Sequence, residues 1–234
     1  MSLVTDALSI TTKGGIYMSS PENNILDFYY LTISLKDLVR SGWKQWNVQR
    51  KRLESVAEHI FSTCMLAISI HSEFLCSYPI NLERVILMLT VHELEEIVIS
   101  DITPFDNVSP EEKMRRGHEA IHQLLAPLRL NYKYEGLIHE FDEHKTLEAQ
   151  YAYMCDKLDA DLMSLYYDQD LNCTVENATL HLQQNGDIQN LSNNGAYTMG
   201  ECFYIVEGES NRLDENFSKI LEEARWRFIQ MRMR

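Results

Sequence analysis

The sequence predicts an all-α fold, a helical bundle that encloses a metal site. Apolar residues recur at helical spacing over most of the chain from residue 25 onward, which is the pattern of amphipathic helices. Three separated pieces place histidines and carboxylates inside these apolar patterns, where ligands must lie if several helices are to hold one ion. The pieces are Glu54–His59, His92–Glu96 followed by Asp101, and Asp156–Asp159.

Composition restricts the class of protein. With 234 residues and 45% hydrophobic content, the chain can bury one full core, and we expect a single domain. A formal net charge of −14 argues against a nucleic-acid polymer as partner, because phosphate backbones are bound through clustered Lys and Arg. No apolar run approaches the roughly 20 residues of a membrane span, and the five cysteines form no CxxC pair. We therefore expect a cytoplasmic protein with reduced thiols and no membrane partner.

Two parts are expected along the chain: an irregular N-terminal arm over residues 1–24 and a helical domain over residues 25–234. Gly14-Gly15 and Ser19-Ser20-Pro21 interrupt the arm, since these residues disfavour continuous elements. Residues 25–38 have apolar positions at helical spacing and are expected to form the first helix. Gly42 is expected to stop it.

The next two expected helices carry the metal-binding candidates. Residues 55–74 have an apolar stripe that includes His59, so this histidine is predicted to be buried. Asn81 is expected to cap an almost wholly apolar helix that runs through Ile97. This central helix brings three candidates into the core: His92, Glu93 and Glu96.

The later part of the chain is expected to return to helices after one insertion. Asp101–Pro104 should end the central helix, because the residue before a proline is steered away from helical geometry. Further helices are expected at about 110–125, 134–167 and 213–232. An insertion at about 172–212 begins with a stretch rich in Asn, Gln, Gly and Thr. Its alternation at residues 178–182 favours a β-hairpin or a mobile loop.

A divalent ion in a hydrolase needs three or four protein ligands and one position left for water. His59, His92, an acid beside His92, and Asp156 supply such a set. A lone histidine on an apolar helix face is more often a hydrogen-bonded core residue. That alternative is weaker here because two such histidines occur with Asp156, and a buried carboxylate without a partner is costly.

Other candidates have simpler interpretations beside the functional one. Glu95 and Glu96 could form a solvated helix face, although Glu96 lies four residues after His92, on the same face of a helix. Asp101 could be a turn acid, and Arg40 a solvated surface charge. A second metal could use His118 or His144, but four later histidines fit exposed faces better: His118, His122, His139 and His144.

Several motifs together resemble the HD-domain phosphohydrolases, and in particular their 5′-deoxynucleotidase branch. They are Arg40-Ser41-Gly42-Trp43, Glu54–His59, His92–Pro104, Thr146–Ala149 and Asp156–Asp159, in the order and spacing of that family. The resemblance covers about residues 26–168. It extends neither to residues 1–25 nor to the Asn-rich insertion.

The resemblance implies an all-α homodimer with one divalent metal ion, either Co, Mn, Mg or Zn. Three of its ligands correspond to His59, His92 and Asp156, and Glu93 stands at the position of the fourth. Such enzymes hydrolyse deoxyribonucleoside 5′-monophosphates to nucleoside and phosphate, so the implied partner is a small nucleotide.

The resemblance also implies residues for the chemistry. Glu96 corresponds to the glutamate that assists proton transfer, and Asp101 to the aspartate that holds water or the sugar. Arg40 is expected on the phosphate and Trp43 near the nucleoside. An arginine and a metal ion would supply the positive centre that a chain of this net charge needs for an anionic substrate.

Two departures from the family pattern concern the metal site. Glu93 replaces the aspartate of the name-giving His-Asp doublet, which moves the carboxylate by about one C–C bond. Glutamate remains a competent oxygen ligand, so the ion could persist with altered affinity or be lost. Ser100 replaces the glycine usually found before the aspartate at position 101.

These departures leave three hypotheses. The first is a metal-dependent phosphomonoesterase. The second is a non-catalytic nucleotide- or metal-binding protein that keeps the bundle. The third is a phosphodiesterase with a second metal. Retention of Arg40, Glu96, Asp101 and Asp156 favours the first.

Overall fold

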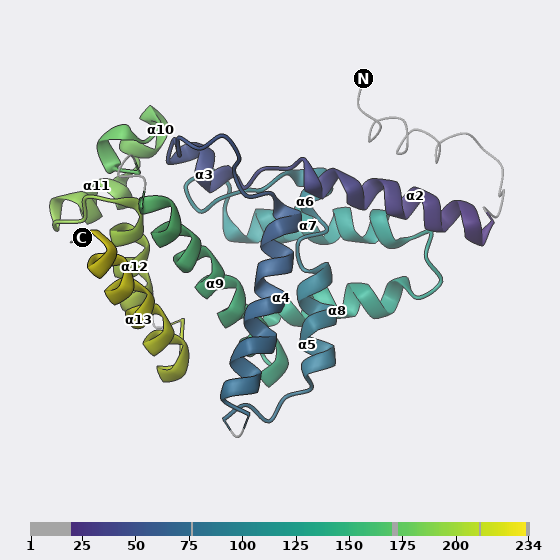
Figure 1. Cartoon of the computed structure of the whole chain (residues 1–234). Helices are drawn as coiled ribbons and strands as arrows, with labels where there is room; N and C mark the ends of the chain where they lie inside the picture. The colour runs from purple at the N-terminus through teal and green to yellow at the C-terminus, as the bar shows by residue number, and fades with distance from the viewer. Residues whose placement is uncertain (1–19, 76, 170–172, 211, 233–234) are drawn as a thin grey trace.

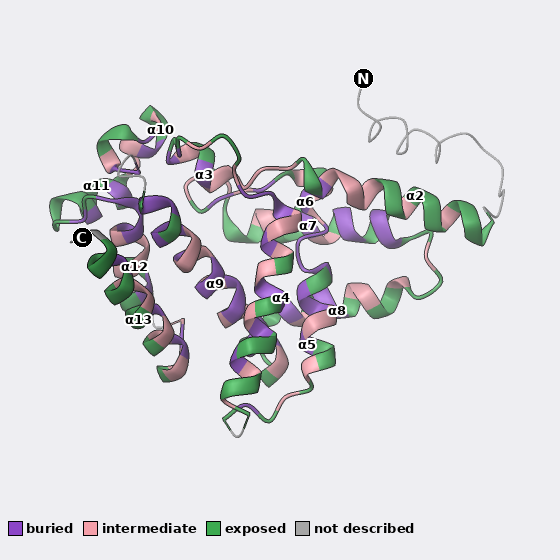
Figure 2. Ribbon diagram, in the orientation of Figure 1, coloured by how far each residue is buried: buried purple, intermediate pink, exposed green. Residues whose placement is uncertain are grey.

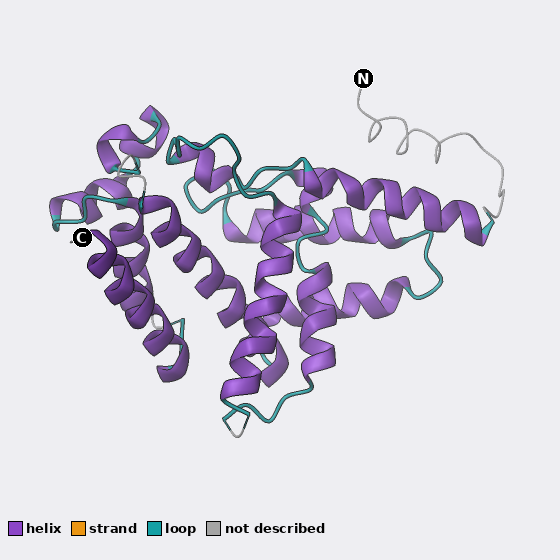
Figure 3. Cartoon of the chain, viewed as in Figure 1, coloured by secondary structure: helices purple, strands orange, loops and turns teal. Residues whose placement is uncertain are grey.

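The computed structural model describes residues 20–75, 77–169, 173–210 and 212–232 (Figure 1). Within these ranges the chain forms helices and no strand (Figure 3), so the prediction of an all-α fold is confirmed. The helices of the first half are α2 (Pro21–Ile33), η2 (Ser34–Lys36), α3 (Ser41–Gln45), α4 (Val56–Glu73), α5 (Leu82–Val91), α6 (Glu96–Ile99) and α7 (Pro110–Leu125). Those of the second half are α8 (Asn131–Glu143), α9 (Leu147–Asp168), η3 (Val175–Asn177), α10 (Leu180–Gln183), α11 (Gly186–Asn193), α12 (Met199–Ser210) and α13 (Glu215–Arg232).

Helix α9 is the centre of the molecule. It packs against α4, α5 and α8 on one side and against α12 and α13 on the other, and Figure 2 shows buried residues along α9. Twelve of its 22 residues are buried, which is expected of a helix enclosed by several neighbours. None of the helices in the described ranges has the length and apolar character that a bilayer crossing requires.

The first helix begins earlier and ends earlier than predicted. Ser20 caps α2 and Pro21 occupies its first turn, a favourable pair at a helix start. The predicted arm therefore loses its last residues to α2, and residues 1–19 lie outside the described residues. Gly42 does not stop this helix. It lies inside the short helix α3 instead.

Helix α4 matches its predicted range, whereas the predicted central helix is shorter. Ser55 and Glu58 form a reciprocal capping box at the start of α4. Helix α5 ends at Val91, and residues 92–95 form turns. Hydrogen bonds from Leu94 N–H to the Val91 carbonyl and from Glu96 N–H to the Glu93 carbonyl, both 3.2 Å long, show the tighter i to i+3 pattern that replaces the α-helix here.

The helix predicted over residues 134–167 is two helices. His144 ends α8 in the left-handed conformation, with φ of 49°, and Thr146 caps α9 by accepting a hydrogen bond from Ala149 N–H. The Thr146–Ala149 motif is thus a helix N-terminus. The predicted helix at 110–125 is confirmed as α7, and the helix predicted at 213–232 is confirmed as α13 within two residues.

The alternative of a β-hairpin in the insertion is wrong for its described part. Residues 173–198 form η3, α10 and α11, with a single isolated bridge between Thr174 and Thr198. The side chain of Asn185 caps α11 rather than forming a hairpin turn. Gly195, with φ of +98°, ends that helix in a conformation that glycine tolerates.

The insertion packs against the segment around α3 and builds a second apolar core. Trp43 and Trp46 are buried there, with Tyr167 at the end of α9. Leu182, Ile188 and Leu191 come from the insertion. The Thr179 N–H also donates to the Gln45 carbonyl at 2.8 Å. The insertion is therefore a structural partner of the residues that follow Arg40.

Gly200 is required where α12 meets α9. Its N–H donates to Asp168 Oδ2 at 3.0 Å, and a Cβ added there would lie 2.7 Å from the same oxygen and 3.0 Å from Leu165 Cδ2.

We expect Gly200→Ala to lower the free energy of unfolding by about 1–3 kcal/mol, measured by urea denaturation. The matched control is Gly208→Ala on the same helix, where no atom lies within 4 Å of the added Cβ. It should raise stability by up to about 1 kcal/mol, and equal losses in the two variants would contradict the packing.

Candidate metal centre

Four buried side chains converge where α4, the end of α5 and α9 meet. Each offers one ligand atom, and the four atoms lie within 4.8 Å of one another. Glu93 Oε1 is 3.5 Å from Nε2 of both His59 and His92, and Asp156 Oδ1 is 3.0 Å from His59 Nε2. Two imidazoles and two carboxylates in this arrangement match the donor set of a divalent metal ion.

The hydrogen bonds of the two histidines orient their Nε2 atoms toward this cluster. His92 Nδ1 lies 2.7 Å from the Leu89 carbonyl. A carbonyl only accepts, so Nδ1 carries the proton and a neutral ring presents its Nε2 lone pair. His92 Nε2 is buried and has no hydrogen-bond partner among the described residues. His59 Nδ1 similarly pairs with Asp159 Oδ2 at 2.7 Å, the usual support of a metal-binding histidine. These residues fit a metal ion.

Two cations flank the carboxylates of the cluster. Lys157 Nζ lies 2.8 Å from Asp156 Oδ2, and Arg40 Nη1 lies 3.1 Å from Glu93 Oε1. Burial opposes the charged forms of both carboxylates. Nevertheless, His92 and His59 lower the pKa of Glu93. Lys157 and His59 likewise lower the pKa of Asp156. The two carboxylates are therefore held in the charged form that binds cations.

Arg40 is a half-buried residue of the site. Its side chain is 16% exposed. Burial lowers the pKa of its guanidinium, but the carboxylates of Glu93 and Asp101 raise this pKa by more, so it lies above its usual value and the group stays charged. The interpretation of Arg40 as a solvated surface charge is therefore wrong.

Glu96 and Asp101 border the same cluster. Glu96 is 2% exposed and its Oε2 has no hydrogen-bond partner among the described residues, so the alternative of a solvated helix face is wrong for it. Burial, followed by the charges of Glu93 and Asp101, raises its pKa. Asp101 Oδ2 accepts a short hydrogen bond from the Ser41 N–H. Asp101 thereby fixes the turn that begins at Arg40.

Ser100 has a strained backbone. Its φ of 63° and ψ of 167° lie in a region that is essentially restricted to glycine and costs of order 1–3 kcal/mol for other residues. The family pattern that the sequence resembles has glycine at this position. The strained residue lies directly before Asp101, so its backbone conformation sets where the Asp101 carboxylate lies.

Trp43 is brought near the site but its side chain points away from solvent. It is 3% exposed, packs against Tyr167 and Phe203, and donates from Nε1 to Glu54 Oε2 at 2.9 Å. The expectation that Trp43 lies near a nucleoside stays a prediction.

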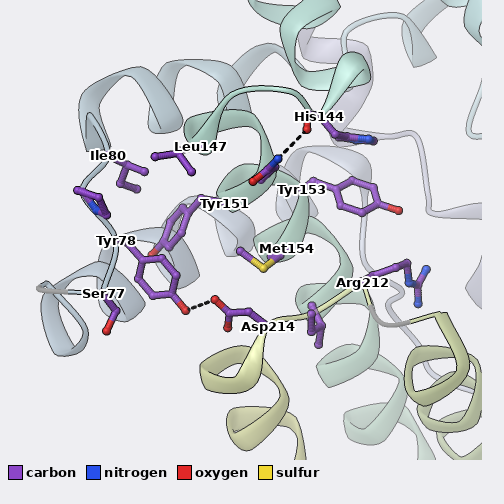
Figure 4. Close-up of a pocket in the computed structure, with 13 residues that line it drawn as sticks. Ser77, Tyr78, Ile80, His144, Leu147, Tyr151, Tyr153, Met154, Arg212 and Asp214 are labelled. Carbon is purple, nitrogen blue, oxygen red and sulfur yellow. Dashed lines mark hydrogen bonds between the residues drawn. The ribbon is translucent and has the colours of Figure 1, made fainter.

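The later histidines do not join a metal cluster in the described residues. His118 pairs with Asp142 at 2.6 Å and its ring contacts that of His139, and neither of the two groups able to hold a metal includes them. His144 lines a separate cavity of about 470 Å³ between the Ser77–Ile80 segment, α9 and the start of α13 (Figure 4). In this cavity Tyr78 donates to Asp214 Oδ2 at 2.6 Å.

Three residues of the site received no role from sequence reasoning: Glu54, Lys157 and Asp159. Asp159 had a detectable signal, because it lies three residues after Asp156 and so faces the same side of a helix. Lys157 lies next to the candidate ligand Asp156, where helical geometry gives no reason to expect contact. Glu54 precedes its helix, so no periodicity could have assigned it.

The family model and the curated relatives that match this chain indicate the same family. A model of the HD domain matches residues 33–195. The 5′-deoxynucleotidase HDDC2 of Bos taurus is 33% identical over 147 residues, which cover 62% of this chain and 68% of the relative. The 5′-deoxynucleotidase hdd1 of Schizosaccharomyces pombe is 33% identical over 156 residues, with 64% and 75% coverage.

Solved structures share the fold. A conserved hypothetical protein from Pyrococcus furiosus matches with a TM-score of 0.61 and 21% identity, over 86% of this chain and 98% of that one. A protein from Magnetospirillum magnetotacticum, described as a predicted metal-dependent phosphohydrolase, matches with a TM-score of 0.61 and 17% identity, over 92% and 95%.

The His59–Asp159 hydrogen bond predicts a measurable effect on metal affinity. We expect Asp159→Ala to weaken Mn²⁺ binding by about 10–100-fold, because the Nδ1 proton of His59 loses its acceptor. Titration calorimetry on chelator-treated protein measures this change. Asp161→Asn is the matched control, since Asp161 is a buried acid of the same helix whose Oδ2 has no hydrogen-bond partner among the described residues, and it should leave the affinity nearly unchanged. An Asp159→Ala protein that binds Mn²⁺ as wild type does would contradict the assigned role.

Proposed function

Because the chain belongs to the HD domain family, we propose that it is a metal-dependent phosphohydrolase that converts deoxyribonucleoside 5′-monophosphates to nucleoside and phosphate. The observation that carries the proposal is the buried cluster of two histidines and two carboxylates with the charged Arg40 against it. The 5′-deoxynucleotidase relatives support the substrate class.

His59, His92, Glu93 and Asp156 would hold one divalent ion. When bound, such an ion polarises phosphoryl oxygens and favours the deprotonated form of water. The donor set of two nitrogens and two oxygens suits Co, Mn or Zn, and Mg less well, since Mg²⁺ prefers oxygen ligands.

Arg40 would bind the phosphate. Its guanidinium is charged and half-buried, and its partner Glu93 leaves several of its N–H donors for other acceptors. Guanidinium and phosphate form bidentate, charge-assisted hydrogen bonds. A phosphate held by Arg40 would lie against the cluster, because Arg40 Nη1 is already 3.1 Å from one of its carboxylates.

Glu96 would move protons. A general base works best when its pKa lies near the working pH, and burial with neighbouring negative charge raises the pKa of Glu96. Its Oε2 has no partner among the described residues, so this atom is available to accept a proton from the attacking water. Asp101 would fix the Arg40 turn and hold water or the sugar.

A non-catalytic binding protein is the second candidate, and Glu93 is the observation that favours it. The longer side chain places the same oxygen against Arg40 and against both histidines. If Glu93 stayed bound to Arg40, it would compete with phosphate for the guanidinium, and the bundle would bind its ligand without hydrolysing it. The Glu93→Asp variant separates the two candidates.

We also propose that the protein acts in the cytoplasm as a homodimer. Cys64, Cys155 and Cys202 are buried free thiols, which suits a reducing compartment. On α4, Phe61, Met65 and Ile68 are exposed, with Phe61 at 65%, and exposed apolar residues of this kind often mark contacts between chains. Sedimentation analysis of the purified protein should give twice the mass of the chain, and a monomer at micromolar concentration would contradict the proposal.

The proposed function predicts phosphate release from deoxyribonucleoside monophosphates. We expect release in the presence of added Co²⁺, Mn²⁺ or Zn²⁺, and loss by at least about a thousandfold in Asp156→Ala, because that change removes a proposed ligand. Arg40→Ala should raise KM by about tenfold or more, since a charged phosphate contact is lost. A panel of deoxy- and ribonucleoside 5′-monophosphates with colorimetric detection of phosphate measures both.

Two outcomes would contradict this function. Release that persists in Asp156→Ala would come from another site or a contaminant. No release from wild type together with release from Glu93→Asp would establish the non-catalytic candidate instead.

A further inference from the structure

We propose that Glu54 is a positioning residue that fixes the Arg40–Trp43 turn against the helix that carries His59. The inference rests on the proposed function, because it takes Arg40 as the phosphate ligand. Glu54 is not one of the four candidate metal ligands.

Glu54 contacts both ends of the turn. Its carbonyl accepts a hydrogen bond from the Arg40 N–H at 3.0 Å. Its carboxylate Oε2 accepts another from Trp43 Nε1 at 2.9 Å. Its own N–H donates to the hydroxyl of Tyr167 at 2.9 Å, which ties it to α9. One residue thus joins the first and last residues of the turn to the helix that carries Asp156.

The same segment continues directly into α4. Ser55 caps this helix, and the Val56 N–H donates to the Leu38 carbonyl at 2.8 Å. His59 follows one turn later. Movement of the Arg40 turn relative to His59 is therefore limited by Glu54 from one side, while the bond from Ser41 N–H to Asp101 limits it from the other. Misplacement by about 1 Å between reacting groups can cost about a hundredfold in rate.

A carboxylate at this position is not explained by stability alone. Glu54 is 7% exposed, and one of its oxygens lies within 4.8 Å of an Asp159 oxygen. Burying a charge beside a like charge is unfavourable, and apolar residues of similar volume often serve a buried site as well or better. What an apolar residue cannot do is accept the Trp43 N–H.

The cluster of Glu54, His59 and Asp159 could also be interpreted as a second metal site. Its hydrogen bonds favour positioning instead. Trp43 Nε1 already donates to Glu54, and the Nδ1 proton of His59 lies between the ring and Asp159. An ion bound to His59 Nδ1 would have to displace the proton that this nitrogen shares with Asp159. Two ions per chain, with one lost in Glu54→Gln, would overturn the proposal in favour of a second metal site.

The test compares Glu54→Leu with Glu54→Gln in the Mn²⁺-loaded protein, with inorganic phosphate as probe. Calorimetry measures the Kd for phosphate. This measurement requires no turnover, and the probe contains no nucleoside. We expect Glu54→Leu to weaken phosphate binding about tenfold, while the Kd for Mn²⁺ changes by less than about twofold, since a lost hydrogen bond to the turn displaces Arg40 but no ligand. Glu54→Gln should restore phosphate affinity to within about threefold of wild type, because its amide oxygen can accept the Trp43 N–H.

Trp43→Phe removes the same hydrogen bond from the other side and should give the same loss as Glu54→Leu. It also serves if the leucine variant fails to fold. Asp161→Leu is the matched control for exchanging a buried carboxylate, and it should leave the phosphate Kd unchanged.

The outcomes separate this inference from the proposed function. Arg40→Ala that weakens phosphate binding, with Glu54→Leu and Trp43→Phe at wild-type affinity, would overturn the positioning role alone. Arg40→Ala with wild-type phosphate affinity would overturn the phosphate site itself and the inference with it. A Glu54→Gln protein as weak as Glu54→Leu would overturn the proposal, because an amide oxygen that can accept the Trp43 N–H would then fail to restore phosphate binding.

Discussion

The structure depends on mutual compensation among charges buried at the junction of α4, α5 and α9. His59, Glu93 and Asp156 would each be costly alone in an apolar bundle. Together with Arg40 and Lys157 they form a cluster in which every carboxylate of the set faces a cation or an imidazole. The helices that supply these groups must therefore meet at fixed positions, and the central packing of α9 against α4 and α5 provides them.

Glu93 illustrates why the identity of one ligand affects the whole site. Its oxygen lies at hydrogen-bond distance from Arg40 and within 3.5 Å of both histidines. An aspartate at this position would be shorter by one methylene and would approach one of these partners less closely. The extra reach of glutamate thus links the proposed metal ligands to the proposed phosphate ligand through a single carboxylate. The two functions of the site are therefore coupled through the residue that departs from the family pattern.

The sequence predicted the parts that follow from periodicity and missed those that follow from local hydrogen bonds. Helices α4, α7 and α13 were predicted well because their apolar stripes and caps are strong. The breaks at residues 92–95 and at His144 were not, since tight turns and a left-handed residue leave no periodic signal. The Asn-rich insertion was misjudged because Asn185 and Gly195 are both helix-boundary and hairpin residues, and the packing partners that decide between them, Trp43 and Trp46, are distant in sequence. The positions of His59, His92 and Asp156 were predictable, whereas the contacts of Glu54 required the fold.

The most direct test of the account is an anomalous-diffraction measurement on crystals grown with Mn²⁺. The account predicts one strong anomalous peak per chain, bounded by Nε2 of His59, Nε2 of His92 and the carboxylates of Glu93 and Asp156. A peak bounded instead by Glu54 and Asp159, or the absence of any peak at the four-residue cluster in crystals that hold Mn²⁺ elsewhere, would contradict it.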